Sequence, residues 1–432
     1  MNVMPRFSRS LLALSGCLVL AQTAQAASVT VTTEAELIAA ITAANASGQP
    51  TTIRLTPKQY NFTQAFESAY GPSALPPITG SITIKGQNAD NTVLFNQEQL
   101  MRFFTVLDGA RLVLKNVKLT EGLIECSSNY DCERSGGGAV ANIGGALWIE
   151  HCVLSNNNTY YQEGLGEVRG GAISSADGYL RIEHSTLVDN GTLGDGGGIS
   201  VLNGSSEINQ SSLLSNGVSP SFFGATRRGS GLLAQNADVT IKNSTIAENT
   251  GASYEETISL GIGLYNWGGT MRVINSTITG NSMPFGGGGA GIANTGNLLV
   301  RNSEISGNTA ANRGGGLYNT GQVRLDNVLI KNNELTGFSD SGFPGVNTPQ
   351  FPPGCDRIEH PENCTNGGGG LYNEPSGTVT LKHTAITRNH FTNGTPSDCD
   401  GTVISEGHNR FGVGSSGCTV INPKPSDQFE GP

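Results

Sequence analysis

The stretch from Gly314 to Asn333 reads Gly-Gly-Gly-Leu-Tyr-Asn-Thr-Gly-Gln-Val-Arg-Leu-Asp-Asn-Val-Leu-Ile-Lys-Asn-Asn. It opens on three glycines, passes through an apolar-x-Asn segment and a turn, and then alternates apolar and polar residues up to a closing Asn. Short segments of period two that are separated by turn residues are typical of β-strands rather than of a helix. We therefore interpret the stretch as three strands that form one structural unit.

The same unit recurs along the chain. Its Gly-rich opening is found again at Gly137, Gly170, Gly196, Gly229, Gly261, Gly289 and Gly368. Its closing Asn falls at positions 157, 190, 216, 249, 281, 308, 333 and 389. The shortest step, 25 residues from 308 to 333, predicts the length of one coil, and longer steps predict loops inserted at one corner. Stacked repeats share one elongated core, so the chain is not expected to divide into separate globular domains.

A bend is required inside each unit. Val239, Ile241 and Ile246 can all point inward only if the chain bends at Asn243, because strict alternation would turn Ile246 outward. Asn tolerates the left-handed backbone that such a bend needs. The equivalent positions are His151, His184, Gln210, Asn243, Asn275, Asn302, Asn327 and His383. Coils stacked at about 4.8 Å would place these residues in one polar ladder, which predicts a parallel β-helix.

Two motifs carry a family resemblance. The segments Gly314–Asn319 and Gly368–Asn373, and the segments Asn243–Asn249 and Asn275–Asn281, resemble repeats of bacterial right-handed parallel β-helix proteins of the pectate-lyase-like superfamily. They are most similar to secreted and outer-membrane proteins with Gly-Gly-x-Ile/Leu-x-Asn repeats, such as polymorphic outer membrane proteins. The resemblance covers roughly residues 80 to 412 and implies an all-β, single-stranded right-handed parallel β-helix solenoid. These families differ widely in activity, so no catalytic residue is transferred.

The N-terminus is expected to be an export signal. Arg6 and Arg9 precede an apolar run, and Ala24-Gln25-Ala26 forms a cleavage site, so residues 1–26 are interpreted as a signal peptide. The alternative is lipidation at Cys17, but the apolar run before it is short. We expect a secreted or cell-surface protein, with the periplasm and the outer membrane left open.

The mature chain is expected to have three parts. Residues 27–80 hold an N-terminal cap and the first irregular coils, and the pattern Thr33–Ala44 predicts an amphipathic helix that caps the core. Residues 81–421 form the β-helix. Residues 422–432 contain three prolines and are expected to be a disordered tail.

The amino-acid composition limits the classes of binding partner that we expect. The 432 residues include 60 glycines and only 14% charged residues, with a net charge of −10. So acidic a protein is a poor partner for nucleic acid or anionic membranes. No uninterrupted apolar run of 18 residues occurs, so no integral membrane span is expected. The oligomeric state stays open.

Seven cysteines follow the signal peptide, in an oxidising compartment. Their spacing suggests three local disulfides, whose pairing the sequence does not fix because six cysteines allow fifteen arrangements. The suggested pairs are Cys126 with Cys132, Cys355 with Cys364, and Cys399 with Cys418. Cys152 is left over and is interpreted as a buried structural thiol.

One column of side chains is expected to face outward next to the Asn of the Gly-rich strand. It reads Ala141, Ser174, Ser200, Leu233, Tyr265, Ala293, Tyr318 and Tyr372, with Trp267 nearby. Aromatic faces along a groove suit stacking against sugar rings. The alternative, which we weigh slightly higher, is that exposed Tyr is simply a good strand residue.

A second column lies ahead of the Gly-rich opening and contains Arg169, Asp195, Arg228 and Arg313. Arg169, Asp195 and Arg228 fall on adjacent coils, which favours a surface ion-pair ladder. The alternative is a clamp for uronate, sulfate or phosphate groups, because Arg binds such anions in a bidentate manner.

The function that these residues favour is a binding or structural module at the cell surface, with carbohydrate as the ligand. The alternative is a polysaccharide lyase or glycoside hydrolase that uses the Arg169, Arg228 and Arg313 edge with Tyr265, Tyr318 and Tyr372 as subsites. The catalytic residues of such an enzyme are unknown, because Asp195 is the only carboxylate found in the two columns. No metal-binding spacing and no cofactor motif is found in the sequence.

Overall fold

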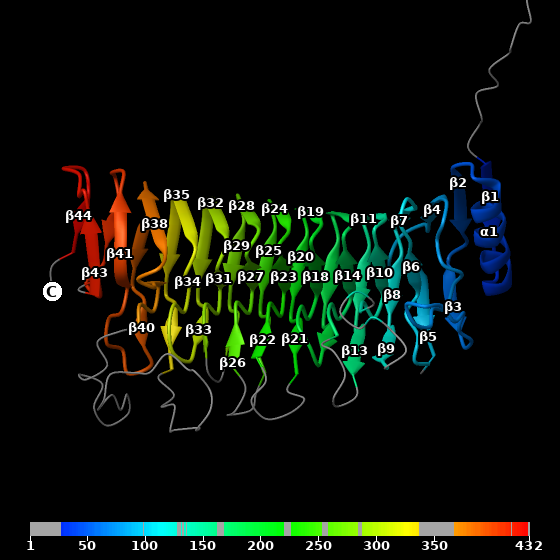
Figure 1. Ribbon diagram of the computed structural model, residues 1–432, viewed down its shortest axis with the longest axis horizontal. Helices are drawn as coiled ribbons and strands as arrows, with labels where there is room; N and C mark the ends of the chain where they lie inside the picture. The colour runs from blue at the N-terminus through cyan, green and yellow to red at the C-terminus, as the bar shows by residue number, and fades with distance from the viewer. Residues whose placement is uncertain are drawn as a thin grey trace, which may run out of the picture.

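The computed structural model describes residues 27–97, 99–127, 131, 134, 136–161, 168–219, 226–252, 258–283, 287–336, 367–415 and 417–430. Its strands pair in parallel with strands of the preceding and following coils, and they form an elongated stack with the first coils at one end and the last at the other (Figure 1). The predicted all-β parallel β-helix is confirmed.

A 34-stranded sheet wraps around the core in three rows of strands, named here rows A, B and C. Row A, which follows the Gly-rich opening, contains β6 (Phe104–Val106), β10 (Val140–Ile143), β14 (Ile173–Ala176), β18 (Ile199–Leu202), β23 (Leu232–Gln235), β27 (Leu264–Trp267), β31 (Ile292–Asn294), β34 (Leu317–Asn319) and β37 (Leu371–Asn373). Row B contains β1 (Ala27–Val31), β2 (Thr51–Leu55), β4 (Ser81–Lys85), β7 (Arg111–Lys115), β11 (Ala146–Glu150), β15 (Tyr179–Glu183), β19 (Ser205–Asn209), β24 (Asp238–Lys242), β28 (Thr270–Ile274), β38 (Thr378–Lys382) and β43 (Gly417–Ile421). Row C contains β3 (Lys58–Phe62), β5 (Thr92–Asn96), β8 (Lys118–Thr120), β12 (Val153–Ser155), β16 (Thr186–Val188), β20 (Ser212–Leu214), β25 (Thr245–Ala247), β29 (Thr277–Thr279), β39 (Ala385–Thr387), β42 (Arg410–Phe411) and β44 (Gln428–Phe429).

Three longer strands span two rows. β32 (Asn297–Ser306) and β35 (Gln322–Lys331) cover rows B and C, and β41 (Cys399–Ser405) covers rows A and B. Short strands form three small sheets between the closing Asn of one coil and the Gly-rich opening of the next. They are β9 (Leu123–Cys126), β13 (Asn158–Tyr161), β17 (Gly191–Thr192) and β21 (Gly217–Val218); β22 (Thr226–Arg228), β26 (Ile258–Leu260) and β30 (Gly287–Gly288); and β33 (Thr309–Ala310), β36 (Glu334–Leu335) and β40 (His390–Phe391).

A single helix among the described residues, α1 (Glu34–Ser47), packs against β1 to β4 at the N-terminal end of the stack (Figure 1). Thr33 is its N-cap, and its hydroxyl accepts a hydrogen bond from the backbone N–H of Glu36 at 3.2 Å. Leu37 and Ile41 are buried against the first coil. The predicted helical cap is therefore confirmed.

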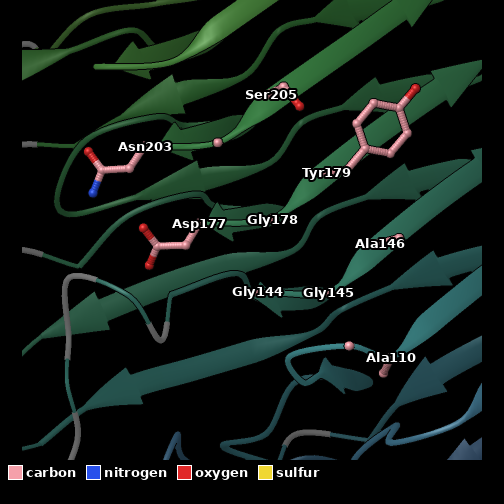
Figure 2. A pocket seen from close by; sticks show the side chains of 11 residues that line it. Ala110, Gly144, Gly145, Ala146, Asp177, Gly178, Tyr179, Asn203 and Ser205 are labelled. Carbon is pink, nitrogen blue, oxygen red and sulfur yellow. The ribbon is translucent and has the colours of Figure 1, made fainter.

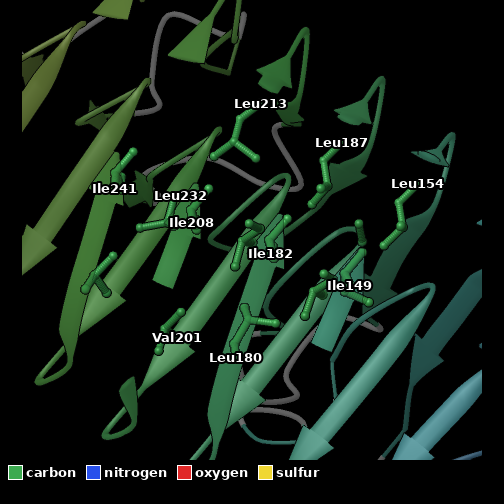
Figure 3. Close-up of a cluster of buried hydrophobic side chains, with 14 of the residues drawn as sticks. Ile149, Leu154, Leu180, Ile182, Leu187, Val201, Ile208, Leu213, Leu232 and Ile241 are labelled. Carbon is green, nitrogen blue, oxygen red and sulfur yellow. The ribbon is translucent and has the colours of Figure 1, made fainter. Parts of the chain in front are cut away.

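Inward side chains of all three rows fill the core (Figure 3). Leu147 and Ile149 of row B lie in register with Leu180 and Ile182 of the next coil. These residues have no exposed surface, and the same holds for the inward positions of most other coils. Burial of a Leu or Ile side chain stabilises the fold by about 1.5–3 kcal/mol each, so the core accounts for much of the stability of the stack.

The bend between rows B and C occurs where the sequence predicts it. All eight predicted bend residues have positive φ, for example 50° at Asn243 and 52° at His151. Asn243, Asn275 and Asn302 are joined by amide–amide hydrogen bonds of 3.2–3.3 Å. The rings of His151 and His184 stack at 4.7 Å. The predicted polar ladder is present on the outside of the coil.

A second Asn ladder lies inside the coil. The closing Asn residues are buried, and each donates its side-chain N–H to the carbonyl oxygen of the next, for example Asn249 to Asn281 at 2.8 Å. The ladder ends when Asn389 donates to Asp398 at 2.9 Å. Because a buried amide without partners is costly, these contacts fix the register of successive coils.

The cysteines agree with the sequence where the structure describes them. Cys399 and Cys418 form a disulfide between the last two coils, as predicted, with a Cα–Cα distance of 5.3 Å. Cys126 is also disulfide-bonded. Cys152 is a buried free thiol, and burial raises its pKa to about 12. Cys132, the predicted partner of Cys126, and the predicted pair Cys355 and Cys364 lie outside the described residues, as do residues 1–26.

The expected disordered tail is corrected in part. Residues 422–430 form a turn and strand β44, which pairs in parallel with β42. The Asp427 side chain holds this turn, because it accepts hydrogen bonds from the backbone N–H groups of Asn409 and Lys424 at 3.0 and 2.7 Å. Pro423 and Pro425 therefore lie in a turn that joins β43 to β44 within the last coil.

Candidate functional site

The predicted Arg column contains a buried ion pair in its N-terminal half. Asp195 is fully buried, and its Oδ2 contacts Nη1 of Arg228 at 3.0 Å, while its Oδ1 accepts the backbone N–H of Arg228 at 2.9 Å. The Arg228 guanidinium lies 4.4 Å from the ring centroid of Trp267. Arg169, one coil before Asp195, hydrogen-bonds the side chain of Gln235. The Asp195–Arg228 ion pair is present, while the full ladder with Arg169 and the anion clamp both stay predictions.

The predicted aromatic column points out of the coil but is not open to solvent in its middle. Tyr265 is only 5% exposed and packs with Leu233 and Ala293, which are fully buried. Trp267 packs against the same cluster. The expectation of an exposed column is wrong at these positions, because alternation decides the direction of a side chain and not whether other side chains cover it.

Further along the column, Tyr318 and Tyr372 stack on each other. Their ring centroids are 5.9 Å apart and their planes differ by 6°. The two residues are in register on neighbouring coils and their rings are nearly parallel, so each ring turns a face toward the other coil. A sugar ring outside the coil would therefore meet ring edges rather than the faces that stacking requires.

The two tyrosines belong to a polar cluster at the C-terminal end of row A. Arg313 Nη1 contacts Glu374 Oε1 at 2.8 Å, and the Tyr318 hydroxyl donates to the same oxygen at 3.1 Å. The Arg313 guanidinium lies 4.9 Å from the Tyr372 ring centroid. Asp400 is in register with Tyr372 and accepts a hydrogen bond from the backbone N–H of Gly367 at 3.1 Å.

Burial dominates the electrostatics of this cluster. It raises the pKa of Tyr318 well above its ordinary value, and the neighbouring Glu374 carboxylate raises it further. Burial also raises the pKa of Tyr372 and of Asp400. Perturbed titratable groups gathered in one place are typical of functional sites, although ion-pair networks perturb them as well.

A groove of about 520 Å³ lies on a different face, along the turns between rows A and B (Figure 2). Tyr179 stands in its row-B column between Ala146 and Ser205 of the neighbouring coils. Both neighbours are small, and the Tyr179 side chain is among those that line the groove. Asp177 and Asn203 project from the turns at its edge, with φ of 55° and 52°. The remaining lining residues are Gly109, Ala110, Gly144, Gly145, Gly178 and Gly204.

Charged and aromatic side chains continue from the groove across the outer face of row B. The Arg111 guanidinium lies 3.9 Å from the Trp148 ring centroid, and that of Arg181 lies 5.3 Å from it. Arg181 also pairs with Glu183 at 2.6 Å. Burial and the nearby Glu207 carboxylate raise the pKa of Tyr179. Trp148 is thus held between two guanidinium groups beside the groove.

Within the described ranges, no group of three or more His, Cys, Asp or Glu side chains could hold a metal ion. No helix in those ranges is long and apolar enough to cross a membrane.

Several residues of these sites lie outside the Gly-rich repeat motif and were not predicted. Asp400 occupies the next position of the Tyr372 column. Its coil lacks the Gly-Gly-x motif, so this position is found only from the strand register. Glu374 follows Asn373 directly, so the position after the Asn of the Gly-rich strand is the sequence signal that marks it. Tyr179 and Trp148 are outward residues of row B, which lies outside the two columns predicted from the sequence.

Comparisons with known proteins give similarity in fold. No protein-family model and no curated protein matches the chain. Among solved structures, the chain is similar to the A-module of mannuronan C-5 epimerase AlgE4 from Azotobacter vinelandii, at 13% identity and a TM-score of 0.39, over 92% of this chain and 91% of that chain. It is also similar to the AlgE6 A-module from the same organism, at 14% identity and a TM-score of 0.31, over 92% and 94%. Likeness at this level assigns no activity.

Proposed function

We propose that this protein binds carbohydrate in the groove beside Tyr179, as an exported protein whose signal peptide is residues 1–26. The observation that carries the proposal is a partly exposed aromatic ring that lines a polar groove. Tyr179 separates Ala146 from Ser205, and Asp177 and Asn203 line the edge.

The chemistry of the groove suits a sugar ring. A pyranose has an apolar C–H face and a rim of hydroxyl groups. The C–H face packs on an aromatic ring, and carboxylate and amide groups form paired hydrogen bonds with hydroxyls. A concave site with one aromatic wall and a few polar groups is the usual form of a small-ligand site.

The groove is also rigid and elongated. It follows consecutive turns of the stack, and successive coils are spaced at about 4.8 Å. Its floor includes the backbone of Gly145, Gly178 and Gly204, where an added side chain would clash; a Cβ at Gly178 would lie 2.5 Å from Asn142 Nδ2. Such a groove suits a linear oligosaccharide that runs along the axis of the stack.

A glycan array screened with the purified protein tests the proposal. We expect retention of one class of oligosaccharide by the native protein and at least tenfold weaker binding by Tyr179→Ala. Tyr160→Ala is the matched control, because Tyr160 is an exposed tyrosine on the separate strand β13. Equal binding by all three proteins, or no retention of any glycan, would refute the groove as a carbohydrate site.

A second candidate function, polysaccharide cleavage, is favoured by the cluster around Arg313. Glu374 is ion-paired and hydrogen-bonded to Tyr318, while burial raises the pKa of the nearby Asp400. Carboxylates in unequal environments can divide the roles of acid and base. Assays for reducing ends and for unsaturated products across a polysaccharide panel test this function. Turnover that is lost in Glu374→Gln and Asp400→Asn would favour an enzyme, and the absence of turnover would favour binding alone.

A further inference from the structure

Charge is distributed unevenly along the stack. Residues 51–120, which form the first coils, contain seven basic and four acidic residues. Residues 121–432 contain 16 basic and 29 acidic residues. With β1 and the helical cap included, residues 27–120 contain seven basic and six acidic residues, so the N-terminal end is nearly neutral while the rest of the stack is strongly acidic.

Three of these basic residues form an in-register ladder on the outer face of row B. Arg54 pairs with Lys85, and Lys85 pairs with Lys115, in the registers of β2, β4 and β7. Neighbouring strands are about 4.8 Å apart, so three positive side chains line up over about 10 Å along the axis. Arg111 lies on the same strand and the same face as Lys115, four residues before it.

The ladder is exposed and only partly neutralised. Lys115 pairs with Glu150 of the following coil at 2.6 Å. Arg54 and Lys85 are exposed and form no ion pair with another described residue. Like charges directly opposite each other on neighbouring strands destabilise a sheet. A bound polyanion would relieve this repulsion along the length of the ladder.

The surroundings favour a glycan over other polyanions. Arg111 connects the ladder to the groove, because Gly109 and Ala110 line the groove immediately before it. The long acidic remainder of the stack would repel a DNA duplex or an anionic membrane that extends beyond the first coils. A single polysaccharide chain is narrow enough to contact the ladder alone.

We propose that the ladder of Arg54, Lys85 and Lys115, together with Arg111, binds a linear anionic polysaccharide through its carboxylate or sulfate groups. The inference rests on the proposed function for the class of ligand, and it names a second site and a charge for that ligand. The contacts are charge-assisted and exposed, so their strength falls as salt shortens the Debye length from about 10 Å at 0.1 M to about 3 Å at 1 M.

Matched dextrans test the ladder. Uncharged dextran, carboxymethyl dextran and dextran sulfate of equal length share a backbone and differ in charge. We expect the native protein to bind the two anionic forms in a salt-dependent manner and to bind them more tightly than dextran. The double variant Arg54→Gln/Lys85→Gln should bind them about tenfold more weakly, which corresponds to about 1.4 kcal/mol.

Lys242→Gln is the control, because Lys242 is an exposed lysine in the same column, four coils beyond Lys115. Unchanged thermal unfolding would show that each variant is folded. Equal loss in Lys242→Gln, or no loss in the double variant, would overturn the proposal. Equally tight binding to a DNA duplex or to phosphatidylserine vesicles would overturn the assignment to a glycan. The proposal of a carbohydrate site in the groove is tested separately, by the binding of Tyr179→Ala to the glycan array.

Discussion

Removing one rung of the inner ladder should destabilise the protein strongly. Asn249 is fully buried. Its Nδ2 donates to Leu213 O at 3.1 Å and to Asn281 Oδ1 at 2.8 Å. Its Oδ1 accepts from the backbone N–H of Asn216 at 3.0 Å and from Asn216 Nδ2 at 3.1 Å. Asn249→Ala removes all four contacts and leaves several partners buried without water.

The magnitude follows from these contacts. Each net hydrogen bond contributes about 1 kcal/mol, so the loss of four should lower the free energy of unfolding by about 4 kcal/mol. Asn243→Ala is the matched control in the outer ladder, where Asn243 is exposed and donates to Asn209 at 2.9 Å. We expect a loss of about 1–2 kcal/mol there, because water replaces the lost amide contacts and the remaining cost is that of Ala in the left-handed backbone of the bend.

Urea unfolding followed by circular dichroism at 25 °C measures both values. The reasoning is refuted if Asn249→Ala is no less stable than Asn243→Ala. Such a result would mean that the buried amides do not set the register between coils.

Other predictions concern buried ionisable groups. Arg228→Ala should lower the free energy of unfolding by about 3 kcal/mol, because it removes a guanidinium group that contacts the buried Asp195 carboxylate at 3.0 Å. Arg272→Ala breaks an exposed pair and should cost under about 1 kcal/mol in the same urea assay. Cys152 should resist alkylation by iodoacetamide at pH 8 in the folded protein and react in urea, as mass spectrometry of its peptide can show, because burial raises its pKa to about 12; labelling of the folded protein would contradict this. Burial raises the pKa of Asp400, so the folded state holds this proton more tightly than the unfolded state does. The native protein should therefore lose stability relative to Asp400→Asn as the pH rises above about 3.9, and parallel pH profiles for the two proteins would contradict the prediction.

The fold could be predicted because its determinants are local and repeated. The left-handed bend at Asn243 follows from the directions of Val239, Ile241 and Ile246, and each coil repeats the same constraint. The helix from Glu34 follows from its N-cap. Such features depend on residues that are close in sequence, so one unit is enough to reveal them.

The candidate sites could be predicted only in part, because they depend on register between coils. The groove exists since Ala146 and Ser205 fall on either side of Tyr179, and these residues are 33 and 26 positions away from it. The Tyr265 column was predicted to point outward, but its cover by neighbouring side chains depends on packing between coils. Loop lengths vary from coil to coil, so counting along the sequence does not give these contacts.

Distances between spin labels in the row-B column test the central claim most directly. Lys242 and Lys382 are four rungs apart, and Lys115 and Lys382 are eight rungs apart. At about 4.8 Å per rung, pulsed electron paramagnetic resonance on the two double-cysteine variants should give backbone separations of about 19 and 38 Å, whatever the loop lengths between them. Separations that do not double between the two pairs would contradict a chain that returns over itself once per coil.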